Sequence, residues 1–296
     1  MANDNSNNLE NLADWSKPDF WQSLAPALHV CDPQFISNQN AVSFKTDTLT
    51  VMDSDLLTEG YTRHRPEDWG VDMAALAGHI EKLHTQNFLP VFSFVYDEYW
   101  LLFAKLREAL SHVLGTDYQI MPAFWTWCLM PGADSVGFPP HRDRGRTSLL
   151  DDGRAKALTI WIALTEATAE NGCIYLLPAD LDKNYNSPNE DTWSFDYNDV
   201  RAQPCPAGTL MCWNQAILHW GGRSSKHAQN PRISISLEFQ RADVPPFNKP
   251  LLPNDSLPPF EVRMKLIALQ ILQYKHLYPL SPELESFTMQ MGLGGA

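Results

Sequence analysis

The sequence predicts a mainly β core, a sandwich or barrel, with flanking helices. From about residue 124 onward, short runs rich in β-branched and aromatic residues are separated by Gly, Pro and Asn. Before these runs, apolar residues recur at helical intervals in two segments. A further helical stripe follows a proline-rich stretch near the end of the chain. Together these patterns place the strands in the centre and helices on either side.

Two helices are expected ahead of the strands. The first covers residues 71–86, where Leu76, Ile80 and Leu83 share one face. The second is expected to run without interruption over 98–114 and to end at Gly115. The segment before them begins with a polar tail and gives no assignment.

Five strands are expected, with a long insert among them: 124–130, 157–164, 173–177, 209–213 and 233–240, interrupted by 178–206. The insert is polar with several aromatic residues, and two readings stay open: it covers the active site, or it is a decorative loop. A proline-rich connector leads to a helix over 262–274. We expect its apolar stripe, Met264, Ile267, Ile271 and Tyr274, to pack on the body or on a second subunit.

Composition favours a soluble enzyme. The chain has 296 residues, 44% of them hydrophobic, enough to bury a sizeable core. We expect a single domain over 1–296, with an unassigned segment 1–60, helices and core over 61–245, and connector and helix over 246–296. The net charge of -13 argues against nucleic acid or an anionic membrane as a partner. A polar N-terminus, no long apolar run and five scattered cysteines favour reduced thiols and a cytoplasmic protein.

One pattern indicates a metal site. His141 and Asp143 are separated by one residue, and His219 follows 76 residues after Asp143. Alternate residues of a strand point to the same face, so His141 and Asp143 can converge on one ion while Arg142 points away. Two neutral imidazoles and one carboxylate suit Fe(II) that reacts with oxygen. Alone the triplet is weak evidence, because such spacing recurs by chance.

An arginine at a suitable distance adds a second element. Arg232 lies 13 residues after His219. Its planar guanidinium matches a carboxylate through two parallel charge-assisted hydrogen bonds, so it is the expected anchor for a dicarboxylate cosubstrate.

Several ordered blocks surround these residues. They are PPHRD at 139–143, LTIWIAL at 158–164, ENGCI at 170–174, LP at 177–178 and AGTL at 207–210, leading through Asn214 to His219, Gly221 and Gly222. Over roughly residues 120 to 240 the chain resembles the phytanoyl-CoA dioxygenase family of Fe(II)/2-oxoglutarate oxygenases. The resemblance implies a double-stranded β-helix, or jelly roll, of the cupin-like kind.

The resemblance also implies roles for individual residues. His141, Asp143 and His219 correspond to the iron ligands, and Arg232 to the partner of the distal carboxylate of 2-oxoglutarate. Further cosubstrate contacts are expected at Trp161, Thr126 and Ser234, although Trp161 is alternatively a core aromatic residue and Ser234 a simple strand serine. The chain departs from the family after His219, where it reads WGGRS, and Arg223 competes with Arg232 for the carboxylate.

The implied reaction is oxygenation. In halogenating relatives a small residue replaces the carboxylate ligand, whereas here Asp143 is present. We therefore expect O2 and 2-oxoglutarate to be consumed while a small-molecule substrate is hydroxylated, with release of succinate and CO2. Ascorbate is a candidate reductant, and a homodimer is a candidate assembly. The substrate itself is not specified by the sequence.

Two features bear on the substrate. Arg142, Arg144, Arg146 and Arg154 cluster around the metal triplet and either receive an anionic substrate or belong to a solvated loop. Trp125 and Trp127 share a strand face and either line an apolar substrate pocket or fill the core.

Two other function classes stay open. One is a jelly-roll metal enzyme of another chemistry, such as a cupin-type isomerase, which would not need the cation of Arg232. The other is a catalytically silent binding module that keeps the fold. A complete set of ligands argues against the silent module.

Overall fold

The computed structural model describes residues 9–132 and 137–293. Its helices are α1 (Pro18–Leu24), α2 (Pro33–Ser37), α3 (Thr46–Thr58), α4 (Met73–Thr85), α5 (Asp97–Ala104), α6 (Arg107–Leu114), α7 (Phe260–Gln273) and α8 (Pro282–Leu293), with short 3-10 helices that include η3 (Pro90–Val95). The polar start of the chain, where no secretion signal was expected, lies outside the described residues.

The strands form two antiparallel sheets. They are β1 (Tyr61–His64), β2 (Gln119–Leu129), β3 (Ala157–Ala163), β4 (Ile174–Leu177), β5 (Arg201–Gln203), β6 (Leu210–Asn214), β7 (Leu218–Gly221) and β8 (Arg232–Gln240). The larger sheet has the order β1-β6-β3-β8-β2, and the smaller has the order β5-β4-β7. The two sheets face each other across a second core that includes Trp161 and Met211 from the larger and Ile174 and Leu176 from the smaller.

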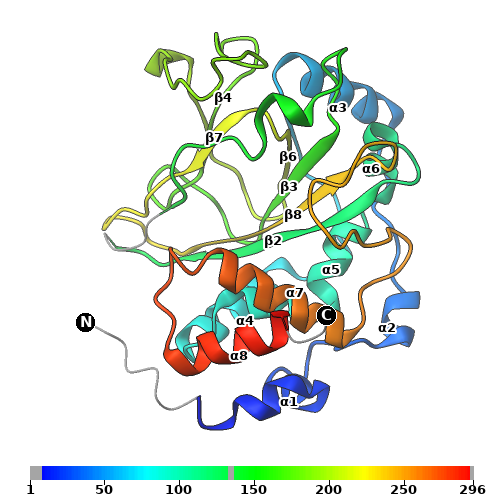
Figure 1. Ribbon diagram of the computed structural model, residues 1–296, viewed down its shortest axis with the longest axis vertical. Helices are drawn as coiled ribbons and strands as arrows, with labels where there is room; N and C mark the ends of the chain where they lie inside the picture. The colour runs from blue at the N-terminus through cyan, green and yellow to red at the C-terminus, as the bar shows by residue number, and fades with distance from the viewer. Residues whose placement is uncertain (1–8, 133–136, 294–296) are drawn as a thin grey trace.

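The other face of the larger sheet packs on helices. Figure 1 shows α4, α7 and α8 gathered beneath β2, on the side away from β4 and β7. Leu158, Ile160, Ile235 and Leu237 alternate along β3 and β8 and enter the main core with these helices. The antiparallel sheets with flanking helices are therefore as predicted. Helices account for about 35% of the chain and strands for about 19%, so a mainly β protein is not confirmed.

All five predicted strands are present, with ends within one residue of those expected, except that β2 begins five residues earlier. The strands β1, β5 and β7 were not predicted. The helix predicted over 98–114 is instead two helices, α5 and α6, separated at Lys105 and Leu106. The carbonyl of Lys105 accepts a hydrogen bond from the backbone N–H of Val42 at 3.0 Å, and its Nζ donates to the carbonyl of Asn40 at 2.9 Å. This segment from the N-terminal region binds the chain at the break, a contact that periodicity along 98–114 cannot reveal.

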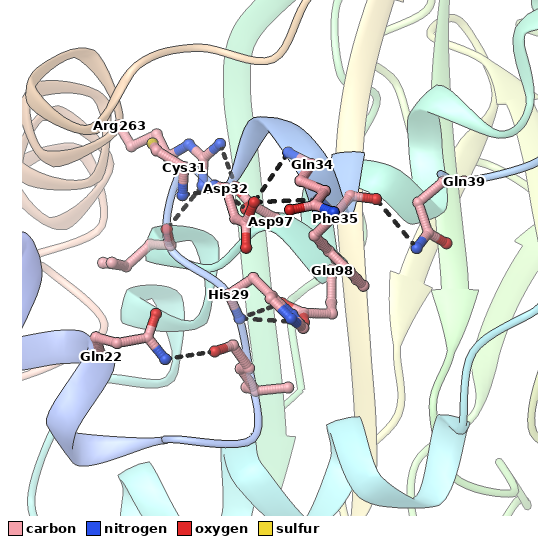
Figure 2. A network of polar contacts seen from close by, with 12 residues as sticks. Gln22, His29, Cys31, Asp32, Gln34, Phe35, Gln39, Asp97, Glu98 and Arg263 are labelled. Carbon is pink, nitrogen blue, oxygen red and sulfur yellow. Dashed lines mark hydrogen bonds and ion pairs between the residues drawn. The ribbon is translucent and has the colours of Figure 1, made fainter. Parts of the chain in front are cut away.

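A buried polar network fastens the unassigned N-terminal segment to the helices (Figure 2). The carboxylate of Asp97 accepts hydrogen bonds from the backbone N–H groups of Cys31 and Asp32, at 3.0 and 2.8 Å, and pairs with Arg263 of α7 at 2.7 Å. Asp97 and Arg263 are both almost fully buried. Glu98 meanwhile accepts from the backbone and ring of His29. Charged groups at the start of α5 thus hold a segment that carries little periodic signal of its own.

The cysteines are all free, as expected from their scattered spacing. Within the described residues, none of the helices has the length and apolar character needed to cross a membrane. The C-terminal stripe packs as predicted at Met264, Ile267 and Ile271, which are buried in the main core. Tyr274, the last member of the stripe, is partly buried against the same core and also lines the cavity described below.

Candidate metal and cosubstrate site

The structure brings His141, Asp143 and His219 together. His141 and His219 pair through two backbone hydrogen bonds of 3.0 Å, which extend the smaller sheet beyond β7. Asp143 follows two residues later, and its Oδ1 lies 3.3 Å from Nε2 of His141 and 3.6 Å from Nε2 of His219. The possible ligand atoms of the three side chains all lie within 4.8 Å of one another.

The outer contacts of these side chains leave their inner atoms free for a metal. The Nδ1 atoms of His141 and His219 lie 2.8 and 3.2 Å from the backbone carbonyls of Pro139 and Ile217. Because a carbonyl only accepts, each Nδ1 carries the proton and each Nε2 presents its lone pair. Asp143 has a matching arrangement, since its Oδ2 accepts from Thr159 at 2.7 Å and from the Trp213 indole at 3.0 Å. The donor set therefore fits a divalent iron ion.

The electrostatics of Asp143 and His219 agree with this division of roles, whereas at His141 the Asp143 carboxylate outweighs burial and raises the pKa. Burial alone would raise the pKa of Asp143, but the nearby imidazoles of His219 and His141 and the Thr159 hydroxyl outweigh it and hold the pKa below its usual value. Burial lowers the pKa of His219 to about 4, despite the opposing charge of Asp143. The carboxylate therefore stays ionised and His219 neutral at physiological pH, as ligands must be.

Two ion pairs brace the loop that carries His141 and Asp143. Arg142 points away from the cluster, as predicted, and pairs with Asp182 at 2.6 Å. Arg142 also donates to the backbone carbonyls of Glu190 and Ala216. Asp182 and Glu190 both belong to the 178–206 insert.

The insert therefore supports the metal loop, an outcome between the two predicted readings. Its described residues do not line the cavity at the cluster. Arg144 forms the second brace, with Glu238 of β8 at 2.7 Å, while Arg154 pairs with Asp152 on the surface. Three of the four clustered arginines are thus engaged by carboxylates of the chain, which leaves the exposed Arg146 as the solvated member of the set.

Arg232 faces the same cavity as the cluster. It is 1% exposed, and its Nε donates to the carbonyl of Gly172 at 3.0 Å. A second nitrogen, Nη1, donates to the Ser234 hydroxyl at 2.7 Å. Among the described residues no carboxylate forms an ion pair with Arg232, and burial lowers its pKa to about 10. It stays protonated at neutral pH as a buried cation that lacks an anion.

Trp161 also lines this cavity. Its ring lies 6.0 Å from the guanidinium carbon of Arg232, and its buried indole N–H has no hydrogen-bond partner within the described chain. Thr126 was a wrong prediction: it is on the opposite face of β2, where its hydroxyl bonds to Ser93 at 2.8 Å. The two-residue alternation of a strand puts Trp125 and Trp127 toward the cavity and turns Thr126 toward the helices.

Arg223, the other candidate for binding the carboxylate, lies outside this cavity. Arg223 is exposed and lines an outer groove with Trp220 and His276, while Arg232 lines the inner cavity. Tyr274, which follows α7, lines the inner cavity beside Trp125, with ring centroids 4.5 Å apart.

The family model of phytanoyl-CoA dioxygenase (PhyH) matches residues 59–230, more than half of the chain. The chain belongs to the PhyH family. Membership makes it an Fe(II)- and 2-oxoglutarate-dependent oxygenase, with iron and 2-oxoglutarate as its cofactors. The match includes His141, Asp143 and His219 and ends two residues before Arg232. No curated protein sequence matches the chain.

Solved structures share the PhyH fold of this chain. The non-heme α-ketoglutarate-dependent epimerase SnoN, from nogalamycin biosynthesis, is 17% identical with a TM-score of 0.52, over 67% of this chain and 85% of SnoN. The non-heme monooxygenase ThoJ, in a nickel complex, is 11% identical with a TM-score of 0.55, over 80% and 99% of the two chains. EctD from S. alaskensis is 16% identical with a TM-score of 0.50, over 75% and 94%.

Four residues of this PhyH-family site were not predicted from the sequence. Thr159 and Trp213 hold Asp143, and Glu238 and Tyr274 line the cavity. A signal existed for Glu238, because Arg232, Ser234, Ser236 and Glu238 alternate with apolar residues along one strand. Tyr274 carried no such signal, since it continues an ordinary helical stripe.

Proposed function

We propose that this oxygenase hydroxylates a C–H bond of a small organic substrate. The observation that carries the proposal is Arg232, a buried cation without an ion-pair partner among the described residues, in the cavity that also contains the His–Asp–His cluster. Iron and 2-oxoglutarate supply O2-dependent oxidation, in which substrate, O2 and 2-oxoglutarate become hydroxylated substrate, succinate and CO2.

His141, Asp143 and His219 are proposed to hold the iron through Nε2, Oδ1 and Nε2. Thr159 and Trp213 orient Asp143 by binding its other oxygen, so that one carboxylate oxygen faces both imidazoles. Because Asp143 supplies an anionic ligand, it fills the place that a halide needs. This supports hydroxylation over halogenation.

Arg232 is proposed to bind the distal carboxylate of 2-oxoglutarate. Ser234 holds the guanidinium from one side and Gly172 from the other, which fixes the direction in which the remaining nitrogen can donate. The unpartnered indole N–H of Trp161 supplies one further donor for a cosubstrate oxygen. A metal enzyme that uses no cosubstrate would have no need for a buried cation there, and this is why we favour the 2-oxoglutarate reading over a cupin-type isomerase.

The metal assignment is tested by anaerobic Fe(II) titration of the wild type and His219→Ala. One ion per chain is expected in the wild type, with affinity at least about 100-fold lower in the variant, because loss of a ligand exceeds the 10- to 100-fold effect of an outer contact. His276→Ala, at an exposed histidine, is the matched control. Unchanged stoichiometry and affinity in His219→Ala would refute the ligand set.

The reaction is tested by following succinate by mass spectrometry with Fe(II), ascorbate and O2. Slow formation without substrate is expected in the wild type, and none in Asp143→Ala, which lacks the anionic ligand. A panel of acyl-CoA, amino-acid-like and terpenoid molecules should reveal a compound that accelerates succinate formation and gains one oxygen atom. No succinate above a metal-free control, with iron confirmed in the protein, would favour the silent binding module.

A further inference from the structure

Glu238 is an acidic residue at the opposite end of the cavity face of β8 from Arg232. The two lie six residues apart on the same side of the strand, a separation of about 20 Å at the usual rise per residue. Glu238 pairs in register with Thr159, the residue that holds Asp143. It therefore lies beside the proposed iron ligands and too far from Arg232 to share a ligand carboxylate with it.

The carboxylate of Glu238 is only partly used by the protein. Its Oε2 accepts from Arg144 at 2.7 Å, Gln215 is a second hydrogen-bond partner, and 18% of its side chain is exposed, on a residue that lines the cavity. Each carboxylate oxygen accepts more than one hydrogen bond. Glu238 thus retains acceptor capacity toward the space where a substrate must lie.

The charges around this space already balance. Burial and the nearby Asp143 raise the pKa of Glu238 to about 7, so above that pH Glu238 is ionised and Arg144 neutralises it. Under the proposed function Arg232 neutralises one carboxylate of 2-oxoglutarate. The two charges of Fe(II) are balanced by Asp143 and the other 2-oxoglutarate carboxylate. A charged substrate group would therefore enter without a counterion, which is costly in a largely buried site.

The remaining wall is aromatic. Trp125, Trp127, Phe138 and Tyr274 form a connected set, with ring centroids of successive neighbours 4.5 to 6.4 Å apart. Phe138 in turn lies 4.4 Å from the ring of His141. Such a surface favours an apolar or flat body placed directly beside the proposed metal.

From these four observations we infer that the substrate is an uncharged, largely apolar molecule that donates a hydrogen bond, such as an alcohol, to Glu238. The inference rests on the proposed function for the place of the metal and cosubstrate. Glu238 is then the residue that determines specificity for substrate charge, and the aromatic wall holds the body of the substrate. An ammonium group must compete with Arg144 for Glu238, and a carboxylate is repelled by both Glu238 and Asp143.

The test uses three probes that share one skeleton: 2-phenylethanol, 2-phenylethylamine and phenylacetate. Their binding is measured at about pH 8, where Glu238 is ionised and the amine and acid probes keep their charges. The method is ligand-observed NMR with the full-length protein, both metal-free and with 2-oxoglutarate and Zn(II), which replaces iron and prevents turnover. In the wild type, the alcohol should bind at least about tenfold more tightly than the amine or the acid.

The variant Glu238→Gln keeps the shape and removes the charge. This variant should bind the alcohol about tenfold more weakly, because a charge-assisted hydrogen bond becomes a neutral one. It should also bind phenylacetate about tenfold more tightly, because Arg144 is left without its carboxylate partner. Asp152→Asn, which removes a surface carboxylate paired with Arg154, is the control and should preserve the ranking.

Zn(II) and 2-oxoglutarate affinities of the same samples separate the two claims. If Glu238 merely braces the metal loop, Glu238→Gln will weaken Zn(II) as much as the alcohol and will not favour phenylacetate, which overturns the inference. Tighter binding of a charged probe by the wild type, or no saturable binding of any probe, also overturns it. A wild type that binds neither Zn(II) nor 2-oxoglutarate refutes the proposed function, while the probe ranking in metal-free protein still tests Glu238.

Discussion

The two faces of β3 and β8 differ in what their side chains contribute. Toward the helices, Ile160, Ile235 and Leu237 are buried among apolar neighbours. Toward the cavity, Trp161 and Arg232 are equally buried. Among the described residues, however, the indole N–H of Trp161 has no hydrogen-bond partner, and the cation of Arg232 has no carboxylate. Burial stabilises the fold on one face, and on the other it maintains binding groups at a cost in stability.

The largest effect is expected on the helix face. Ile235→Ala should lower the free energy of unfolding by about 2 to 5 kcal/mol, because it leaves a cavity among packed side chains. The affinity of the folded protein for 2-oxoglutarate should change by less than about twofold. Chemical denaturation and a binding titration measure the two quantities. A variant of normal stability with much weaker 2-oxoglutarate binding would break the proposed separation between the faces.

The next effect belongs to the cavity face. Arg232→Ala should weaken 2-oxoglutarate binding at least about tenfold, since a lost hydrogen bond to charge costs about 1.5 to 3 kcal/mol. Its thermal stability should fall by less than that of Ile235→Ala, because removal of a buried cation without an anionic partner in the described protein offsets the loss of its hydrogen bonds to Gly172 and Ser234. Arg223→Ala, at the exposed arginine, is the control and should change the affinity by less than about twofold. The reverse ranking in a binding titration would assign the role to Arg223.

A polar group on the helix side provides a pH test. Burial lowers the pKa of His79 to about 4 from an ordinary value near 6.5, so the unfolded chain takes up a proton at a higher pH than the folded chain. The contribution of the neutral His79 to the free energy of unfolding is therefore fully present above pH 6.5 and is lost as the pH drops from 6.5 towards 4. By pH 5 the free energy of unfolding should have fallen by about 2 kcal/mol on this account, and His79→Gln should abolish this part of the pH dependence. Identical denaturation curves against pH for both proteins would contradict this assignment.

The smallest expected effect concerns the indole N–H of Trp161 in the cavity. Trp161→Phe keeps an aromatic ring and removes the indole N–H. Binding of 2-oxoglutarate should weaken about twofold to tenfold, the worth of one neutral hydrogen bond. The melting temperature should rise or stay constant, because the unpartnered donor disappears. Unchanged affinity with a lower melting temperature would make Trp161 a core residue, the alternative reading of its sequence.

Much of this site was predictable because its signals are local. The spacing of His141 and Asp143 correctly predicted that they converge, although His141 lies on an isolated bridge and Asp143 in the bend that follows, not on a strand. Trp125 and Trp127 share one face of β2. The same rule applied with an uncertain register produced the error at Thr126, since a shift of one residue moves a side chain to the opposite face. Glu238 could have been found from its alternation with Ile235 and Leu237. Tyr274 could not, because nothing in a helical stripe says that its last residue reaches a distant cavity.

The sequence by itself determined five of the eight strands in the described residues, the family, the cluster of candidate ligands and the arginine that faces the same cavity. These depend on side-chain alternation and on ordered motifs, which are properties of the chain read in order. Only the tertiary structure decided that residues 98–114 form two helices, that the 178–206 insert braces Arg142, and that Glu238 meets Arg144. Each of these depends on a hydrogen bond or ion pair between residues dozens of positions apart, and the energy of such a contact exists only after the chain has folded.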